Sequence, residues 1–162
     1  MLFSKYLNSF TYFNLLLIFF FSLSVNKVES LYIINSISYV IFHFLIVYLS
    51  FYYHRKILYL IFFIFGLGSD LLLLNNIGPH LVVFMILLFT IERIKNFFNN
   101  FESRKIYFII IFIQSLILFL EMIISHYFFH YYFDHILYLK LLFISLFISY
   151  PLLLIFSKID NK

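Results

Sequence analysis

The sequence contains no cysteine, no alanine and no tryptophan, and it has only three glycines and two prolines. The absence of cysteine excludes disulfide bridges, thiolate metal sites and cysteine nucleophiles. A GxSxG nucleophile motif, a GxxxxGK phosphate loop and a complete dinucleotide-binding glycine pattern are also missing. Chemistry on a substrate is therefore unsupported, and we expect a protein that is not an enzyme, with no catalytic residue and no cofactor.

Charged residues are scarce as well. They make up 11% of the chain, whereas 65% of the residues are hydrophobic; soluble domains usually have about a quarter charged and about half apolar residues. The dominance of Phe, Ile, Leu, Tyr, Asn and Lys is typical of AT-rich genomes, so we give the abundance of Phe no functional meaning. This composition predicts an integral membrane protein with one polytopic domain over residues 1–162.

The apolar residues come in long blocks, and about 20 such residues cross a bilayer. We expect an all-α bundle of about six transmembrane helices, at residues 10–25, 31–53, 57–74, 77–92, 106–129 and 136–156. Two interpretations of the first block stay open. It is either a retained span or a signal peptide, because Ser22 and Ser24 resemble a small-x-small cleavage site.

Lys and Arg are distributed unevenly between the two sides of such a bundle. Only Lys27 and Lys140 fall on one side, and the other nine basic residues fall on the opposite side. These nine are Lys5, Arg55, Lys56, Arg93, Lys95, Arg104, Lys105, Lys158 and Lys162. Because cytoplasmic loops carry the excess of Lys and Arg, we expect a multi-pass membrane protein with both termini in the cytoplasm.

The net charge of +4 is also explained by basic residues that lie beside the ends of membrane spans. Basic residues that bind nucleic acid gather on a polar segment with interleaved aromatics, whereas these sit at the ends of apolar blocks. We therefore expect no nucleic-acid partner. The basic loop formed by Arg93, Lys95, Arg104 and Lys105 is predicted to face the cytoplasm.

All three glycines and one proline lie between Gly66 and Pro79. Gly66 and Gly68 are predicted to let a neighbouring helix pack closely, as small residues do in membrane proteins. A tight turn into the fourth span is expected at Asn75, Asn76, Gly78 and Pro79. Whether the stretch serves packing alone or a function as well stays open at this point.

Ionisable residues inside the spans form a second group of candidates. A carboxylate there costs about 2.5–3.5 kcal/mol on insertion scales, so it is expected to face the bundle interior and find a partner. Asp70, Glu121 and Lys140 all fall in the outer third of their spans, and we predict one polar cluster that includes Gln114, seven residues before Glu121.

Two polar stripes accompany this cluster, one of Gln114, Glu121 and Ser125, the other of Ser36, His43 and Ser50. Hydrogen bonding between helices is one interpretation of such stripes, and a path for a substrate or for protons is the other.

The spacing of two histidines would allow them to bind one metal ion. His126 and His130 are spaced to share a metal on one helix face, with Asp134 and His135 nearby. The alternative is that they lie among tyrosines at the membrane interface. We expect no metal site, because no cysteine assists and no HExxH pattern is present.

The third and fourth spans resemble a known family. Gly66, Asp70, Gly78 and His80, followed by an apolar helix with a basic end, are similar to the signature region of the bacterial rod shape-determining protein MreD. Tyr150–Pro151 matches a Tyr-Pro pair that MreD proteins often carry in their last helix, and the length and number of spans agree.

This resemblance implies a non-catalytic scaffold of the cell-wall elongation machinery, located in the bacterial inner membrane. Such a subunit would bind MreC and, through it, couple MreB filaments to the RodA glycosyltransferase and its transpeptidase partner. Asp70 and His80 would shape the outer end of the bundle, the glycines would admit a partner helix, and the loop from Arg93 to Lys105 would face the filament and anionic lipid.

Two other classes of function remain as alternatives. One is the substrate-binding membrane subunit of a vitamin-type energy-coupling transporter, in which Asp70, Glu121 and Lys140 would line an outward pocket. The other is an intramembrane enzyme, for which the sequence shows no catalytic dyad.

Overall fold

The computed structural model describes residues 2–26, 32–74, 77–98, 103–130 and 135–160, and within them the chain is helical, with no strand. The six helices are α1 (Leu2–Ser24), α2 (Tyr32–Tyr52), α3 (Ile57–Leu73), α4 (Pro79–Phe98), α5 (Ser103–Phe129) and α6 (His135–Asp160). Each expected span coincides with one helix. The turn residues Asn75 and Asn76 lie outside the described residues.

The largest differences from the expected ranges are at α1 and α4. α1 begins at Leu2 instead of at residue 10, and α4 continues to Phe98, beyond Glu92. Both extensions contain basic residues, Lys5 in α1 and Arg93 and Lys95 in α4. Basic residues end an apolar block but do not end a helix, since Arg and Lys are good helix formers. Hydropathy thus predicted the apolar part of these helices and missed their polar extensions.

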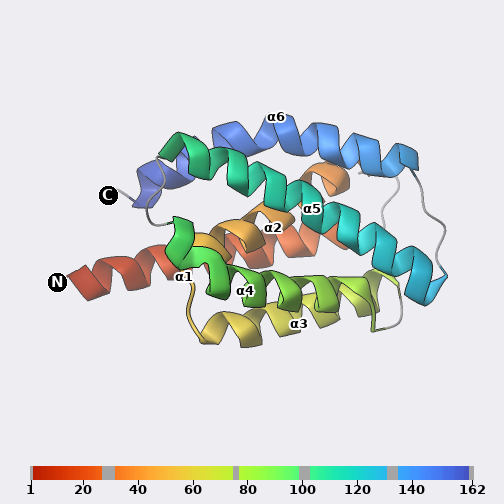
Figure 1. Ribbon diagram of the computed structural model, residues 1–162, viewed down its shortest axis with the longest axis horizontal. Coiled ribbons are helices and arrows are strands. Elements are labelled where there is room, and N and C mark those ends of the chain that lie inside the picture. Colours follow the sequence, from red (N-terminus) through yellow and green to blue (C-terminus); the bar gives the residue numbers. More distant parts are fainter. Residues whose placement is uncertain (1, 27–31, 75–76, 99–102, 131–134, 161–162) are drawn as a thin grey trace.

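Helix α2 is the centre of the bundle. It packs against α1, α4, α5 and α6, and its residues are buried almost continuously from Ser38 to Ser50. α3 packs against α4, and α3 and α6 lie along opposite sides of the molecule (Figure 1). The two chain termini lie at the same end of the bundle (Figure 1); we call the opposite end, where α3 ends and α4 begins, the far end.

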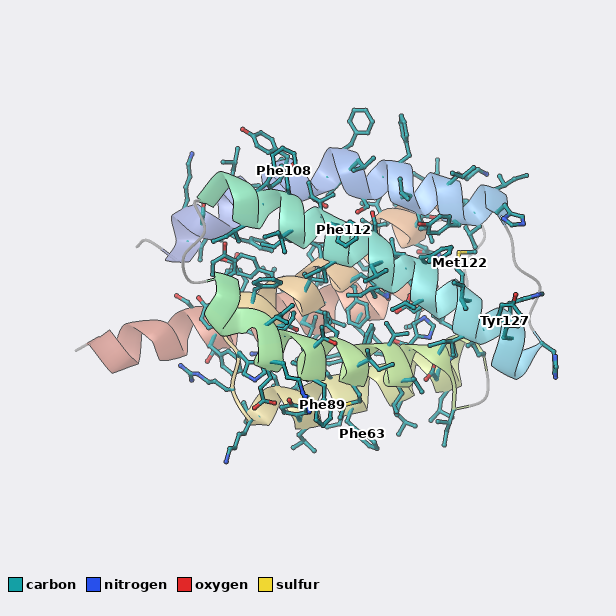
Figure 2. The ribbon with its side chains drawn as sticks, in the orientation of Figure 1. Phe63, Phe89, Phe108, Phe112, Met122 and Tyr127 are labelled. Atoms are coloured by element: carbon teal, nitrogen blue, oxygen red, sulfur yellow. The ribbon has the colours of Figure 1, made fainter. Side chains whose placement is uncertain are left out.

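The outer surface of the bundle is strongly apolar. Among the described residues, three helical segments are long and apolar enough to cross a membrane, Tyr32–Tyr52, Ile106–Tyr127 and His135–Ile159, and two shorter apolar ones are Ser9–Ser24 and Ile57–Leu73. Phe108 is 70% exposed and Phe112 is 67% exposed on α5 (Figure 2). Soluble monomers rarely show large contiguous apolar patches, so this surface is compatible with a protein surrounded by lipid.

Aromatic rings fill the interior near the termini. Phe13 of α1 packs edge-on against Phe156 of α6, with ring centroids 5.0 Å apart, and against Tyr48 of α2 at 5.1 Å. Tyr48 and Phe156 also meet edge-on at 5.2 Å. Edge-to-face pairs of this kind are favourable beyond their buried area, and here they join three helices that are distant in the sequence.

The glycines of α3 lie where neighbouring helices come close. A Cβ atom on Gly66 would lie 2.6 Å from the Cα of Leu81, so the backbones of α3 and α4 can be this close only because Gly66 has no side chain. A Cβ on Gly68 would instead meet the ring of Phe21 on α1 at 3.0 Å. Gly78 has no positive φ, and Pro79 is the first residue of α4, a position that proline favours.

Gln114 joins three helices through hydrogen bonds. Its Nε2 donates to the carbonyl oxygen of Val40 on α2 at 3.1 Å, and its Oε1 accepts from the hydroxyl of Ser149 on α6 at 2.8 Å. Both Gln114 and Ser149 are fully buried. This arrangement supports the first interpretation of its polar stripe, hydrogen bonding between helices.

Candidate functional site

The site is built on Asp70, a fully buried carboxylate in the last turn of α3. One oxygen, Oδ2, accepts hydrogen bonds from the backbone N–H groups of Gly78 and Leu81 at 2.9 and 3.0 Å. The other, Oδ1, accepts from the backbone N–H of His80 at 3.1 Å. The first N–H groups of a helix have no partner within it, and a negative charge is favoured there. Asp70 therefore caps α4 from the preceding helix.

His80 extends this contact toward the centre of the bundle. Its Nδ1 lies 2.7 Å from Oδ1 of Asp70, and its Nε2 lies 3.0 Å from the hydroxyl oxygen of Tyr39 on α2. The side chain of His80 is almost completely buried. Its ring is thus held at both nitrogens, by a carboxylate on one side and a hydroxyl on the other.

Glu121 of α5 completes the network. Its Oε2 accepts a hydrogen bond from the Tyr39 hydroxyl at 2.9 Å, and its Oε1 lies 2.8 Å from Nε2 of His43 on α2. Nδ1 of His43 lies 2.8 Å from the backbone carbonyl oxygen of Tyr39. Five side chains from α2, α3, α4 and α5 are therefore linked in one buried chain of polar contacts.

The acceptors determine where two of the ring hydrogens lie. A carbonyl oxygen can only accept, so Nδ1 of His43 carries a hydrogen; the Asp70 carboxylate likewise accepts from Nδ1 of His80. Both rings consequently turn their Nε2 atoms toward Tyr39 and Glu121. The two carboxylates therefore each have a histidine ring as a direct partner, as carboxylates buried within a helical bundle are expected to have.

A cavity of about 480 Å³ lies beside this network at the far end of the bundle. Tyr39, His80 and Glu121 contribute to its wall, and the rest of the lining is mainly apolar, including Leu118 and Leu141. Mostly apolar cavities with a few convergent polar groups are typical of sites for small molecules. The network is thus accessible from one side.

The predicted polar cluster forms only in part. The structure brings Asp70, His80 and Glu121 together, while Gln114 lies farther along α5 with the separate partners described above. Lys140 does not join them. It is exposed on α6 and borders a different hollow, lined also by Tyr32 and Phe143. Histidine, not lysine, is the basic partner of the two carboxylates.

Two members of the network were not assigned this role from the sequence. His43 was placed on a polar stripe with Ser36 and Ser50, but those two hydroxyls donate to carbonyl oxygens of their own helix. Tyr39 was not singled out, because nothing distinguishes it among fourteen tyrosines. Its position four residues before His43 was the only available signal, since residues at this spacing share a helix face.

The other predicted residues lie at the ends of helices. α5 ends at Phe129, and His130 follows it with a positive φ of 57°, so His126 and His130 do not share one helix face. His126 is exposed, and Asp134 lies outside the described residues. Arg93 is exposed near the end of α4.

The other three basic residues of the predicted loop lie in helices α4 and α5. Lys95 lies in α4, and Arg104 and Lys105 lie in α5. These parts of α4 and α5 are at the end of the molecule that holds the chain termini (Figure 1).

Comparison of the chain with protein-family models, with curated proteins and with solved structures finds no match.

Proposed function

We propose that this protein is a non-catalytic membrane scaffold of the machinery that elongates the cell wall, similar in role to MreD. In this proposal all six helices cross the bacterial inner membrane, with both termini in the cytoplasm. The protein binds MreC and, through it, couples MreB filaments to RodA and the elongation transpeptidase.

The observation that carries the proposal is the joint between α3 and α4. The residues that resemble the MreD signature all take part in it. Gly66 permits the close approach of Leu81, the backbone N–H of Gly78 donates to Asp70, and His80 contacts Asp70 through both its backbone and its ring. A motif whose groups bind one another is suited to shaping a rigid bundle, which is what a scaffold needs.

The charge pattern supports the orientation. Nine of the eleven basic residues would lie on the cytoplasmic side of a six-span bundle. Arg93, Lys95, Arg104 and Lys105 would then face anionic lipid and the cytoplasmic filament, since basic residues near a membrane are attracted to anionic headgroups. The site around Asp70 would lie toward the periplasm, where a partner anchored by a single helix could reach it.

Capture of MreC tests this proposal. The tagged chain, solubilised with mild detergent from cells that express the MreC protein of the same organism, is expected to retain MreC, and its depletion is expected to give rounded cells. Gly66→Leu should abolish both capture and rod shape because it forces α3 and α4 apart. The matched control, Phe112→Leu on the exposed face of α5, should preserve both. Wild-type protein that captures no MreC would contradict the proposal.

The cavity favours a second candidate, the substrate-binding subunit of a vitamin-type transporter. Its volume of about 480 Å³ and mainly apolar lining suit a small organic ligand. If the chain is such a carrier, the purified protein should bind a radiolabelled vitamin saturably. Ser125→Trp, which fills the cavity, should remove that binding, whereas Phe112→Trp on the outer surface should not. A scaffold predicts no saturable binding in any of the three proteins.

A further inference from the structure

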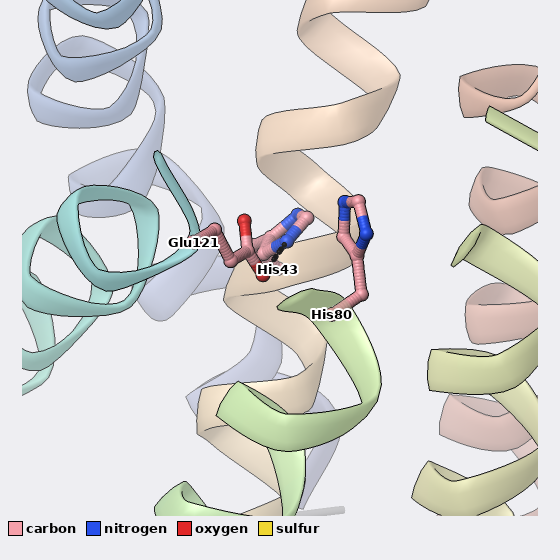
Figure 3. Close-up of side chains that lie close together, drawn as sticks. All are labelled: His43, His80 and Glu121. Carbon is pink, nitrogen blue, oxygen red and sulfur yellow. Dashed lines mark hydrogen bonds and ion pairs between the residues drawn. The ribbon is translucent and has the colours of Figure 1, made fainter. Parts of the chain in front are cut away.

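We propose that His43, His80 and Glu121 form a binding site for a divalent transition-metal ion such as Zn²⁺. The three side chains come from α2, α4 and α5 and lie close together (Figure 3). Each offers one ligand atom, and these atoms all lie within 4.8 Å of one another. Two histidines and one carboxylate are the protein ligands of a common class of zinc and iron sites.

The orientation of both histidine rings matches that of metal ligands. A histidine that binds a metal through one nitrogen almost always donates its other N–H to a carboxylate or a backbone carbonyl. Nδ1 of His80 contacts the Asp70 carboxylate at 2.7 Å, and Nδ1 of His43 contacts the carbonyl oxygen of Tyr39 at 2.8 Å. Both Nε2 atoms are thereby left on the side of the network, where that of His43 contacts Glu121 and that of His80 contacts the Tyr39 hydroxyl.

The charges also fit a divalent cation. Asp70 and Glu121 supply two negative charges in a buried region, and a metal with two positive charges balances them while both imidazoles stay neutral. A buried charge without a partner is very unfavourable, so this balance matters within an apolar bundle. The ion would replace the hydrogens of the His43–Glu121 and His80–Tyr39 contacts. Tyr39 would still donate to Oε2 of Glu121.

The donor atoms select the class of metal. Imidazole nitrogen suits Zn²⁺, Fe²⁺, Co²⁺ and Ni²⁺, whereas Ca²⁺ and Mg²⁺ prefer sites built from oxygen alone. Ligand atoms about 2.0–2.1 Å from a tetrahedral zinc ion are roughly 3.3 Å apart. The present ligand atoms lie within 4.8 Å of one another, so each pair would have to approach by at most about 1.5 Å to bind the ion.

The cavity gives the ion an entry path and an open coordination position. His80 and Glu121 form part of its wall, so a fourth ligand, water or a small anion, can approach the metal from that side. Three protein ligands with one open position are typical of exchangeable sites, whereas purely structural zinc sites are closed by four protein ligands. This site is independent of the proposed scaffold role, which needs no metal.

Cobalt binding tests the site directly. The purified full-length protein in detergent, treated with a chelator, is titrated with Co²⁺ alone, because Co²⁺ with few ligands absorbs visible light far more strongly than the hydrated ion. We expect one Co²⁺ per chain. Glu121→Gln and His80→Gln should weaken binding by more than about 100-fold, and Asp70→Asn by about 10–100-fold, as expected for a residue that orients a ligand.

Controls separate this site from surface histidines and from loss of structure. His126→Gln removes an exposed histidine outside the network and should leave the cobalt affinity unchanged. X-ray absorption of the wild-type cobalt complex, which needs no variant, should show two imidazole ligands. The proposal is overturned if the wild-type protein binds no stoichiometric Co²⁺, if binding depends on His126 instead of Glu121, or if the absorption data show fewer than two imidazoles.

Discussion

At the scale of single residues, Asp70 shows how one carboxylate can organise a junction between two helices. It belongs to the last turn of α3, yet it accepts hydrogen bonds from Gly78, His80 and Leu81 at the start of α4. In an apolar surrounding these N–H groups have no water to bind instead. The cost of placing a charge there is therefore offset by groups that themselves need an acceptor.

Replacing Asp70 tests this role. Asp70→Ala leaves those buried N–H groups without a partner, and unsatisfied buried donors cost about 1–3 kcal/mol each before relaxation. We expect a loss of roughly 2–4 kcal/mol in the free energy of unfolding, measured by titrating detergent-solubilised protein with a denaturing detergent. Thr90→Ala is the control, because the exposed Thr90 hydroxyl donates only within its own helix. Equal stability of the two variants would contradict the capping role.

Tyr39 offers a milder test of the same network. Tyr39→Phe keeps the ring but removes the hydroxyl that contacts both His80 and Glu121. Hydrogen bonds between membrane helices average about 0.6 kcal/mol and reach about 1.7 kcal/mol. We therefore expect a loss of roughly 1 kcal/mol in the same unfolding assay, while Co²⁺ binding persists because no metal ligand is removed. Loss of cobalt binding in Tyr39→Phe would assign the hydroxyl to the ligand set.

At the scale of elements, the pairing of α3 with α4 depends on one missing side chain. The backbone of Leu81 occupies the space that a Cβ on Gly66 would need, whereas Gly68 faces the tip of the Phe21 ring. A backbone cannot move without shifting its whole helix, but a ring can rotate. The two glycines are therefore not equivalent, although the same packing role was predicted for both from the sequence.

This difference yields a paired prediction. Gly66→Ala should destabilise the protein by about 1–3 kcal/mol, the usual range for overpacking, and Gly68→Ala should cost clearly less. Both variants gain the same methyl group and the same helix propensity, so their difference reports the local space alone. Unfolding in denaturing detergent measures it. A larger effect at Gly68 would mean that α3 packs more tightly on α1 than on α4.

The elements themselves were predictable because an apolar run long enough to cross lipid is also a helix, and all six appear near their expected places. The site was predictable only in part. The depth of a residue in the membrane follows from its position along the span. This predicted that Asp70, Glu121 and Lys140 lie at a similar depth. Which side of each helix faces the interior of the bundle depends on packing, and in this respect the two residues differ, since Lys140 is exposed and Glu121 is buried.

At the scale of the whole molecule, the central position of α2 explains how distant residues meet. Tyr39 and His43 lie on this helix, and the helices that supply His80 and Glu121 pack on it. Around this core the exposed surface is rich in isoleucine, leucine and phenylalanine (Figure 2). The same bundle can therefore keep a polar centre and an apolar exterior, as a protein in lipid must.

The proposed role depends on the orientation of the chain in the membrane, and thiol labelling in intact cells measures this orientation most directly. The chain has no cysteine, so each engineered cysteine is the only target of a membrane-impermeant maleimide. Tyr127→Cys, near the end of α5, should react in cells whose outer membrane has been permeabilised. Ser157→Cys, near the end of α6, should react only after the inner membrane has been opened. Labelling of Ser157→Cys in cells with an intact inner membrane would contradict the six-span arrangement with cytoplasmic termini.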